Sequence, residues 1–224
     1  MNTAWFALGL ITAALLIPLL LRTLFDPAFR IWPTPGHGSW QSRVFWTLFR
    51  TLNVTAFATA VTDKSGALIL SAGVRLAGLL VFAVSGALYL SALLALGRSN
   101  TYCSRDGLVT HGIYRWTRNP QYATVIPVFA SLAIAADSGM TYALCLALTC
   151  VYVLMALVEE PWLEAAYGES YRQYCRRVPR FFNWHRAWVL LQTGLRHVHR
   201  QLWPRLLDHT GSALVSTLNG RKRM

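Results

Sequence analysis

Two stretches of the sequence hold the residues whose types and spacing suit chemistry. The first is Gly107–Tyr122, GLVTHGIYRWTRNPQY, and the second is Glu159–Pro179, EEPWLEAAYGESYRQYCRRVP. Both are polar and aromatic, and the residues between them form two uncharged runs, Gln121–Ala136 and Ser138–Val158. If those runs enter a membrane and return, the two stretches meet at one surface. We therefore interpret them as the halves of a single site.

In the second stretch, Glu159 and Glu160 stand directly before Pro161. Proline lacks an N–H and clashes with the carbonyl four residues back, so we expect the membrane helix to kink or end there. Pro161 is then suited to be the first residue of a new helix, whose N-terminal dipole favours the two carboxylates. Helical spacing from Glu159 reaches Leu163, Tyr167, Tyr171 and Tyr174. This predicts an aromatic face that begins at a carboxylate; the plain alternative is that the glutamates mark the end of a span.

In the first stretch, Gly112 permits a turn, Arg115 and Arg118 add cations, and Asn119-Pro120 favours a turn that opens the next helix. Carboxylates, a fixed turn and aromatic rings together suit a cationic ligand that contains a purine. Carboxylates attract an ammonium group, and aromatic faces stabilise a sulfonium by cation–π contact. These residues alone do not distinguish such a ligand from a nicotinamide nucleotide.

The elements that position these stretches are predicted to be membrane helices. Of the 224 residues, 54% are hydrophobic and only 13% are charged, which is about half the share usual in soluble domains. We expect an all-α, polytopic membrane helix bundle of about five transmembrane helices with a cytoplasmic cofactor site. The predicted spans are Thr3–Leu21, Val44–Thr62, Leu76–Gly97, Gln121–Ala136 and Ser138–Val158.

Two features inside the spans predict contacts. Arg50 is costly in lipid, so it must snorkel, pair or face a polar cavity. The third span holds small residues that allow close helix contact, namely Gly78, Ser85, Gly86 and Ala87. The loop Arg22–Arg43 is expected to lie at the membrane interface and to carry no chemistry, with Trp32 and Trp40 as interface residues.

The net charge of +12 raises the possibility of a nucleic-acid partner. The cations cluster at the ends of apolar runs, however, which is typical of the cytoplasmic fringe of membrane spans. With the amino terminus outside, only Lys64 and Arg75 of the 21 basic residues fall near the outer side. Both stretches then face the cytoplasm, and the arginine-rich, lysine-poor composition favours a bacterial inner membrane. We expect the lipid bilayer as a partner, and no nucleic acid.

Three segments follow from this arrangement. Residues 1–97 are predicted to form three scaffold spans, residues 98–182 a core with a helical hairpin, and residues 183–224 a basic amphipathic helix and tail. The four cysteines are scattered, so we interpret them as unpaired thiols, and no metal site is expected.

The stretch LVTHGIYRWTRNPQY resembles the LVTxGxYxxxRHPxY motif of isoprenylcysteine carboxyl methyltransferases and the related phospholipid methyltransferases. The stretch EEPWLEAAYGESYRQYCRRVP resembles their EExxLxxxFGxxYxxYxxxVP motif. The order of the two motifs and the hairpin between them match as well, so the resemblance covers about residues 97–179.

The resemblance implies a cofactor, S-adenosyl-L-methionine, and methyl transfer to a lipophilic or small acceptor that enters from the bilayer. Carried over by position, the cofactor-binding residues are Asp106, Gly107, Leu108, Val109, Tyr114, Asn119, Pro120, Gln121, Tyr122 and Glu159. Glu160 and Arg118 are our candidates for catalytic residues that orient the substrate or complete the cofactor site.

Three positions depart from the family pattern. Asn119 and Asp106 replace histidines, and Met155 replaces an arginine that meets the substrate in the eukaryotic carboxyl methyltransferases. Asn119 keeps hydrogen bonding but loses a titratable imidazole. The methionine favours an amine headgroup, a thiol or a small lipid over a carboxylate as acceptor.

Two other functions fit parts of the pattern. Sterol reductases share a similar carboxy-terminal half and use NADPH, whose 2′-phosphate needs clustered cations. The chain offers Arg115, Arg118, Arg176 and Arg177 for that purpose. A non-catalytic membrane protein with a vestigial site is the third possibility, and the substitutions at residues 106, 119 and 155 support it.

Overall fold

The structure is a computed structural model that describes residues 2–26, 28–36, 38–101 and 107–181. The chain divides into two units, Met1–Phe181 and Phe182–Met224, and the second lies outside the described residues. The predicted amphipathic helix and tail of residues 183–224 therefore lie outside the described residues, as do Asp106 and Cys103.

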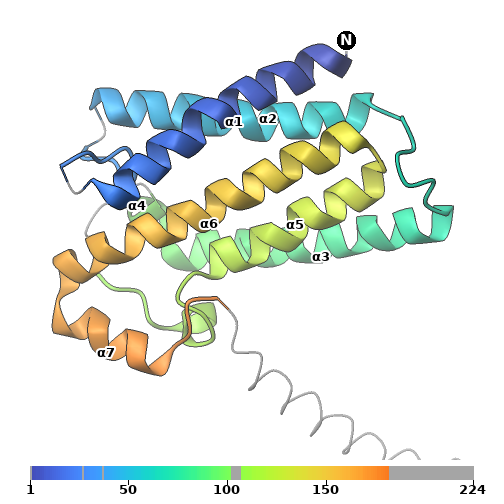
Figure 1. The fold of residues 1–224 in the computed structure, drawn as a ribbon. Helices are drawn as coiled ribbons and strands as arrows, with labels where there is room; N and C mark the ends of the chain where they lie inside the picture. Colours follow the sequence, from blue (N-terminus) through green and yellow to red (C-terminus); the bar gives the residue numbers. More distant parts are fainter. Residues whose placement is uncertain (1, 27, 37, 102–106, 182–224) are drawn as a thin grey trace, which may run out of the picture. The chain divides into compact units, whose positions relative to one another are not determined.

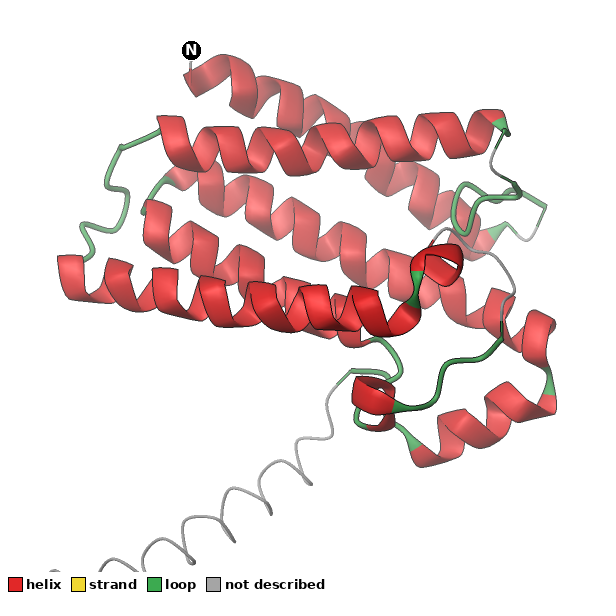
Figure 2. Cartoon of the chain, turned by 180° about the vertical axis from the view of Figure 1, so that it is seen from behind, coloured by secondary structure: helices red, strands yellow, loops and turns green. Residues whose placement is uncertain are grey.

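Within the described residues, all regular secondary structure is helical (Figure 2). The elements are α1 (Asn2–Phe25), α2 (Trp40–Thr62), α3 (Ala72–Leu96), α4 (Arg98–Thr101), a 3-10 helix η1 (Gly112–Arg115), α5 (Pro120–Ala136), α6 (Gly139–Tyr167) and α7 (Glu169–Arg177). Helices α1, α2, α3 and α6 are long and apolar enough to cross a membrane, and α5 is a shorter apolar helix. The predicted all-α membrane bundle is confirmed.

Helix α6 occupies the middle of this bundle, because it packs against α1, α2 and α5, while α3 packs against α5 (Figure 1). The core between these helices is apolar and aromatic. Its largest fully buried side chains include Leu16, Phe45, Phe129, Leu144 and Leu148. Apolar runs near 20 residues long, which suit a bilayer, thus also supply the faces that pack the helices together.

Small residues set the spacing of α3 and α5. A Cβ added to Gly78 would lie 3.1 Å from the backbone nitrogen of Ala135 and 3.2 Å from the carbonyl oxygen of Ser131. The expected close approach of the third span therefore occurs at Gly78. It does not occur at Gly86, where an added Cβ would meet nothing within 4 Å.

The turn between α5 and α6 is held by buried polar groups. Asp137 adopts a left-handed conformation, φ 51°, and its carboxylate accepts hydrogen bonds from the backbone N–H groups of Leu68 and Leu70, both at 2.9 Å. Ser138 caps α6 by accepting from the Thr141 N–H at 3.1 Å, and its hydroxyl donates to Asp63. The predicted hairpin turn is confirmed, and it also anchors the α2–α3 connection.

Of the two outcomes expected at Pro161, the end of the helix is wrong. Helix α6 continues through Pro161 to Tyr167, and the chain turns instead at Gly168, φ 55°, before α7 begins at Glu169. A proline removes a single helical hydrogen bond, whereas a positive φ redirects the whole chain and suits glycine. The glutamates therefore lie within a helix rather than at a helix start.

The two chemically rich stretches lie at the same end of the bundle. Figure 1 shows α4, α7 and the connection between α1 and α2 at one end, and the α2–α3 connection and the α5–α6 turn at the other. The hairpin of α5 and α6 runs the length between them. This is the arrangement expected if an apolar hairpin leaves and returns to one surface.

Candidate functional site

The two stretches are joined by hydrogen bonds just before α5 and just after α7. The Arg118 N–H donates to the carbonyl of Pro179 at 2.9 Å. The Thr117 hydroxyl and the Asn119 side-chain amide both donate to the carbonyl of Arg180, at 3.0 and 3.2 Å. Two segments about 60 residues apart in the sequence are thus fixed side by side, as the single-site interpretation requires.

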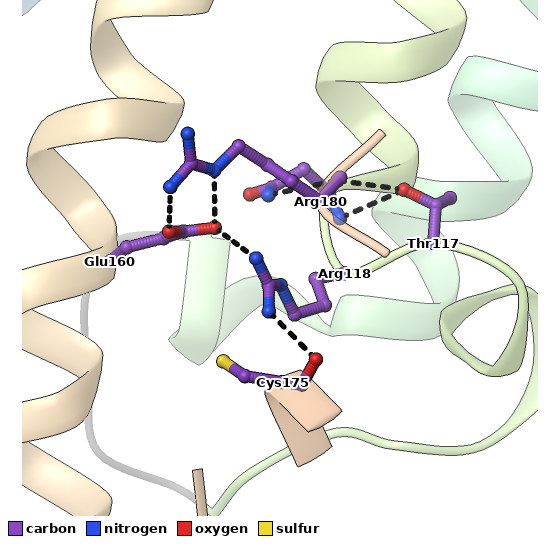
Figure 3. A network of polar contacts seen from close by, with 6 residues as sticks. Thr117, Arg118, Glu160, Cys175 and Arg180 are labelled. Carbon is purple, nitrogen blue, oxygen red and sulfur yellow. Dashed lines mark hydrogen bonds and ion pairs between the residues drawn. The ribbon is translucent and has the colours of Figure 1, made fainter. Parts of the chain in front are cut away.

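An ion-pair network strengthens this junction (Figure 3). Both oxygens of Glu160 accept from Arg180, at 2.8 and 2.5 Å, and one also accepts from Arg118 at 3.0 Å. Arg118 donates further to the carbonyl of Cys175 at 3.2 Å. The side chains of Arg118 and Glu160 are only 12% and 14% exposed, so water screens this pair weakly. The hydrogen bond to Glu160 raises the pKa of Arg180, which keeps it charged.

Aromatic side chains pack beneath the junction. Tyr171 and Tyr174 of α7 are buried with Val178, and Leu108, Leu163 and Tyr167 pack against them. The Tyr174 hydroxyl donates to the backbone carbonyl of Tyr114 in η1 at 2.6 Å. The predicted aromatic face therefore forms, although it is shared by α6 and α7 instead of lying on one helix.

Three of these tyrosines remain neutral phenols. Burial raises the pKa of Tyr114, and the Glu159 carboxylate raises it further. Burial also raises the pKa of Tyr171, with Glu160 adding to the effect, and that of Tyr174 despite the opposing influence of Arg118. Neutral rings with electron-rich faces line the site, and this is the surface on which a cation is stabilised.

A first cavity lies between the two stretches. Its walls come from the end of α3, from α4, from the 107–121 segment, from the C-terminal part of α6 and from α7. It is lined by Leu96, Asn100, Gly107, Leu108, Val109, Tyr114, Arg118, Asn119, Gln121, Glu159, Trp162, Leu163, Tyr167, Tyr171 and Tyr174.

A second cavity lies further into the bundle, between α2, α3, α5 and α6. Its walls are mainly aromatic and apolar, with one cation. It is lined by Trp32, Trp46, Phe49, Arg50, Tyr89, Leu93, Asn100, Thr101, Gln121, Tyr122, Tyr152, Met155 and Glu159.

The two cavities border on each other at three polar side chains, since Asn100, Gln121 and Glu159 line both. The Tyr122 hydroxyl donates to an oxygen of Glu159 at 2.5 Å, so the carboxylate is held in place. A group bound in one cavity and a group bound in the other would therefore meet at a fixed carboxylate. This is the geometry that a transfer between two bound molecules needs.

Most residues carried over from the family pattern lie on the first cavity, namely Gly107, Leu108, Val109, Tyr114, Asn119, Gln121 and Glu159. Arg118, a candidate catalytic residue, lines it as well. Tyr122 lines the second cavity instead. Pro120 opens α5 at its first turn, and neither it nor Glu160 is among the residues that line these two cavities. Asp106 lies outside the described residues.

The sequence patterns did not predict that residues of α2 and of the α1–α2 connection line the second cavity. Trp32 is 3% exposed and stacks on Phe45 with ring centroids 4.5 Å apart, whereas Trp40 is 52% exposed. Trp32 is thus buried and lines the second cavity. The one available signal was Arg50, because a cation in an apolar span needs a polar environment, and it does line a cavity.

Residues 74–170 match the family model of the phospholipid methyltransferases. The matched segment includes α3, α5, α6 and the borders of both cavities, and it confirms the predicted resemblance to integral-membrane methyltransferases. It supports a membrane methyltransferase. Helix α1 and helix α2, the second of which supplies Trp46 and Arg50, lie outside the matched segment. No curated protein and no solved structure matches the chain.

Proposed function

We propose that the chain is an S-adenosyl-L-methionine-dependent methyltransferase of a membrane, with the cofactor in the first cavity and a lipophilic or small methyl acceptor in the second. The observation that carries the proposal is the position of Glu159. Its carboxylate lines both cavities and is fixed by Tyr122 where the two border on each other.

The side chains of the first cavity suit this cofactor in charge and shape. Glu159 offers a carboxylate to an ammonium or sulfonium charge, and the rings of Trp162, Tyr167 and Tyr171 offer faces for cation–π contact and stacking. The amides of Asn119 and Gln121 provide hydrogen-bonding groups. S-adenosyl-L-methionine supplies an activated methyl group when bound, so the protein has to position the reactants more than to activate them.

The surrounding residues hold the Glu159 carboxylate and the walls of the first cavity in place. Tyr122 orients the Glu159 carboxylate, and Glu160 holds Arg118 and Arg180 so that the segments before α5 and after α7 stay together. In this proposal Glu160 and Arg118 act on the site by positioning its walls. Buried rings on both sides of Glu159 exclude water, which strengthens electrostatic contacts to a bound cation.

The proposal includes a cytoplasmic site in a bacterial inner membrane. Soluble cofactor is available on that side, and the basic residues at the motif end of the bundle support the orientation. Within the described residues, Lys64 and Arg75 are the basic side chains at the opposite end, next to the α2–α3 connection.

An NADPH-dependent reductase is supported less well. The 2′-phosphate of NADPH needs cationic side chains that are not already neutralised by a carboxylate. Arg118 lines the first cavity but is paired with Glu160, while Arg115, Arg176 and Arg177 are exposed and are not among the lining residues. The cations at this end therefore favour a structural role over recognition of a phosphate in that cavity.

The test is calorimetric titration of the purified chain in dodecyl maltoside with S-adenosylhomocysteine and, separately, with NADPH. We expect micromolar binding of S-adenosylhomocysteine that weakens at least tenfold in Glu159→Gln, since an exchange of a charge-assisted contact for a neutral one costs about 1.5 kcal/mol or more. Glu164→Gln is the matched control, because that glutamate lies on the same helix and is 51% exposed. Binding of NADPH alone would promote the reductase, and binding of neither would favour a non-catalytic protein.

A further inference from the structure

One face of α2 carries a stripe of polar side chains inside a membrane-length helix. Arg43, Thr47, Arg50 and Thr51 recur at the spacing that places residues on one side of a helix. Together with Ser42 and Trp46 they line a groove on the surface of α2. Arg43, Thr47 and Arg50 are exposed. A helix face that met lipid tails alone would not tolerate two arginines, because charged groups are costly there.

Arg50 lies deep in this stripe. It is the eleventh residue of α2, which puts it about 15 Å along the helix from Trp40 at 1.5 Å per residue. Its guanidinium carbon lies 5.2 Å from the centroid of the Trp46 ring. Neither Arg50 nor Arg43 forms an ion pair with any of the residues that the structure describes. The cation–π contact stabilises the charge in part and leaves its hydrogen-bond donors available.

The groove borders on the second cavity. Trp46 and Arg50 line both, and the same cavity extends to Glu159. Most of the side chains that line this cavity besides Arg50 and Glu159 are apolar or aromatic, with Phe49 and Tyr152 among them. A molecule that moved from the outer surface of α2 toward Glu159 would thus pass Arg50 first.

We propose that this groove is the lateral entrance for the methyl acceptor, and that Arg50 recognises an anionic oxygen group, phosphate or carboxylate, carried by an amphiphilic acceptor. Its planar guanidinium donates two parallel hydrogen bonds to either group. Arg43, two helical turns nearer the end of α2, attracts the same group at the membrane surface. The role as acceptor rests on the methyltransferase proposal, whereas the binding of an anionic amphiphile does not.

The distribution of charged side chains along the second cavity indicates the class of ligand. Near the mouth of the cavity the charged side chain is a cation, and at its far end it is Glu159, a carboxylate. An acceptor with an anionic group and an apolar tail matches the mouth, and the atom to be methylated lies further in, toward Glu159. Arg50 therefore determines both which acceptors enter the cavity and how far they move toward Glu159.

The test is equilibrium binding to the full chain, purified in dodecyl maltoside and measured without cofactor. The probes are radiolabelled dodecyl phosphate, laurate and dodecanol, which share one alkyl chain and differ in the headgroup. We expect the two anionic probes to bind the wild type more tightly than dodecanol does. Arg50→Gln should weaken anionic binding about tenfold and leave dodecanol unchanged, since the lost contacts are charge-assisted.

Two further variants keep the result interpretable. Arg50→Lys retains the charge but not the two-pronged geometry, so it should recover part of the affinity. Arg22→Gln removes a cation from the same end of the bundle, outside both cavities and 63% exposed, and should bind every probe as the wild type does. Thermal unfolding in the same detergent identifies any variant that fails to fold.

The outcomes separate the sources of the anionic group. Arg50-dependent binding of dodecyl phosphate over laurate assigns a phosphate-bearing acceptor, and the reverse preference assigns a carboxylate. Equal binding of the anionic probes to wild type and Arg50→Gln would overturn the inference. That result is independent of S-adenosylhomocysteine binding, so failure of the entrance and failure of the methyltransferase proposal are distinguishable.

Discussion

Both ends of the helix bundle hold carboxylates that are buried or partly buried, yet these carboxylates have different partners. At the end away from the motifs, Asp137 is 2% exposed and both of its carboxylate oxygens accept hydrogen bonds from backbone N–H groups. The Asp63 carboxylate there accepts hydrogen bonds from the hydroxyls of Ser138 and Ser65. At the motif end, Glu159 takes a hydrogen bond from Tyr122 and lines two cavities.

The contrast recurs between two neighbours in the sequence. Glu160 is engaged by two arginines and is not among the cavity-lining residues, whereas Glu159 borders on both cavities. A buried carboxylate whose hydrogen bonds are satisfied by the protein stabilises the fold. One that faces a cavity is available to a ligand, and such groups cluster at functional sites. Three variants sharpen or break this distinction.

The largest effect on folding is expected at the end away from the motifs. Asp137→Ala leaves the N–H groups of Leu68 and Leu70 without their acceptor and puts alanine in a left-handed conformation. We expect a loss of about 3 kcal/mol in the free energy of unfolding. Thermal unfolding in detergent measures it, with Asp137→Asn as the milder control. If the folded fraction of this variant also bound S-adenosylhomocysteine more weakly, the two ends of the bundle would not act independently.

A smaller loss is expected when the ion-pair network at the motif end is broken. Glu160→Gln leaves Arg118 and Arg180 without their carboxylate, and the partly buried pair should cost about 2 kcal/mol of stability. Because Arg118 and Asn119 also line the first cavity, S-adenosylhomocysteine should bind more weakly as well. Calorimetry and unfolding are measured together, with exposed Glu164→Gln as control. Unchanged unfolding with abolished binding would instead mark Glu160 as a direct ligand.

The smallest effect is expected from the hydroxyl that orients Glu159. Tyr122→Phe keeps the ring and removes one hydrogen bond, so stability should change little and S-adenosylhomocysteine affinity should fall roughly tenfold. Tyr142→Phe, a half-buried tyrosine outside both cavities, is the matched control. A variant that binds as the wild type does would show that the carboxylate is oriented by other groups.

The sequence alone determined the membrane character, the helical hairpin and the meeting of the two stretches. These depend on local properties: the length of apolar runs, the polar break at Asp137 and the order of the motifs. The carried-over positions at residues 107–109, 114, 119, 121 and 159 also line the first cavity. A motif records residues that neighbour each other in the chain, and the short distances within it survive folding.

The tertiary structure alone decided the rest. Adjacent glutamates point to different neighbours, which depends on how α6 is rotated against α5 and α7, and sequence spacing does not fix that rotation. The course of α6 through Pro161 was decided by packing along the helix, and the turn fell at Gly168. Trp32 and Arg50 joined the second cavity because α1 and α2 pack against α6 far from the motifs in sequence. Contacts between distant segments are a property of the packed bundle, and no local pattern carries them.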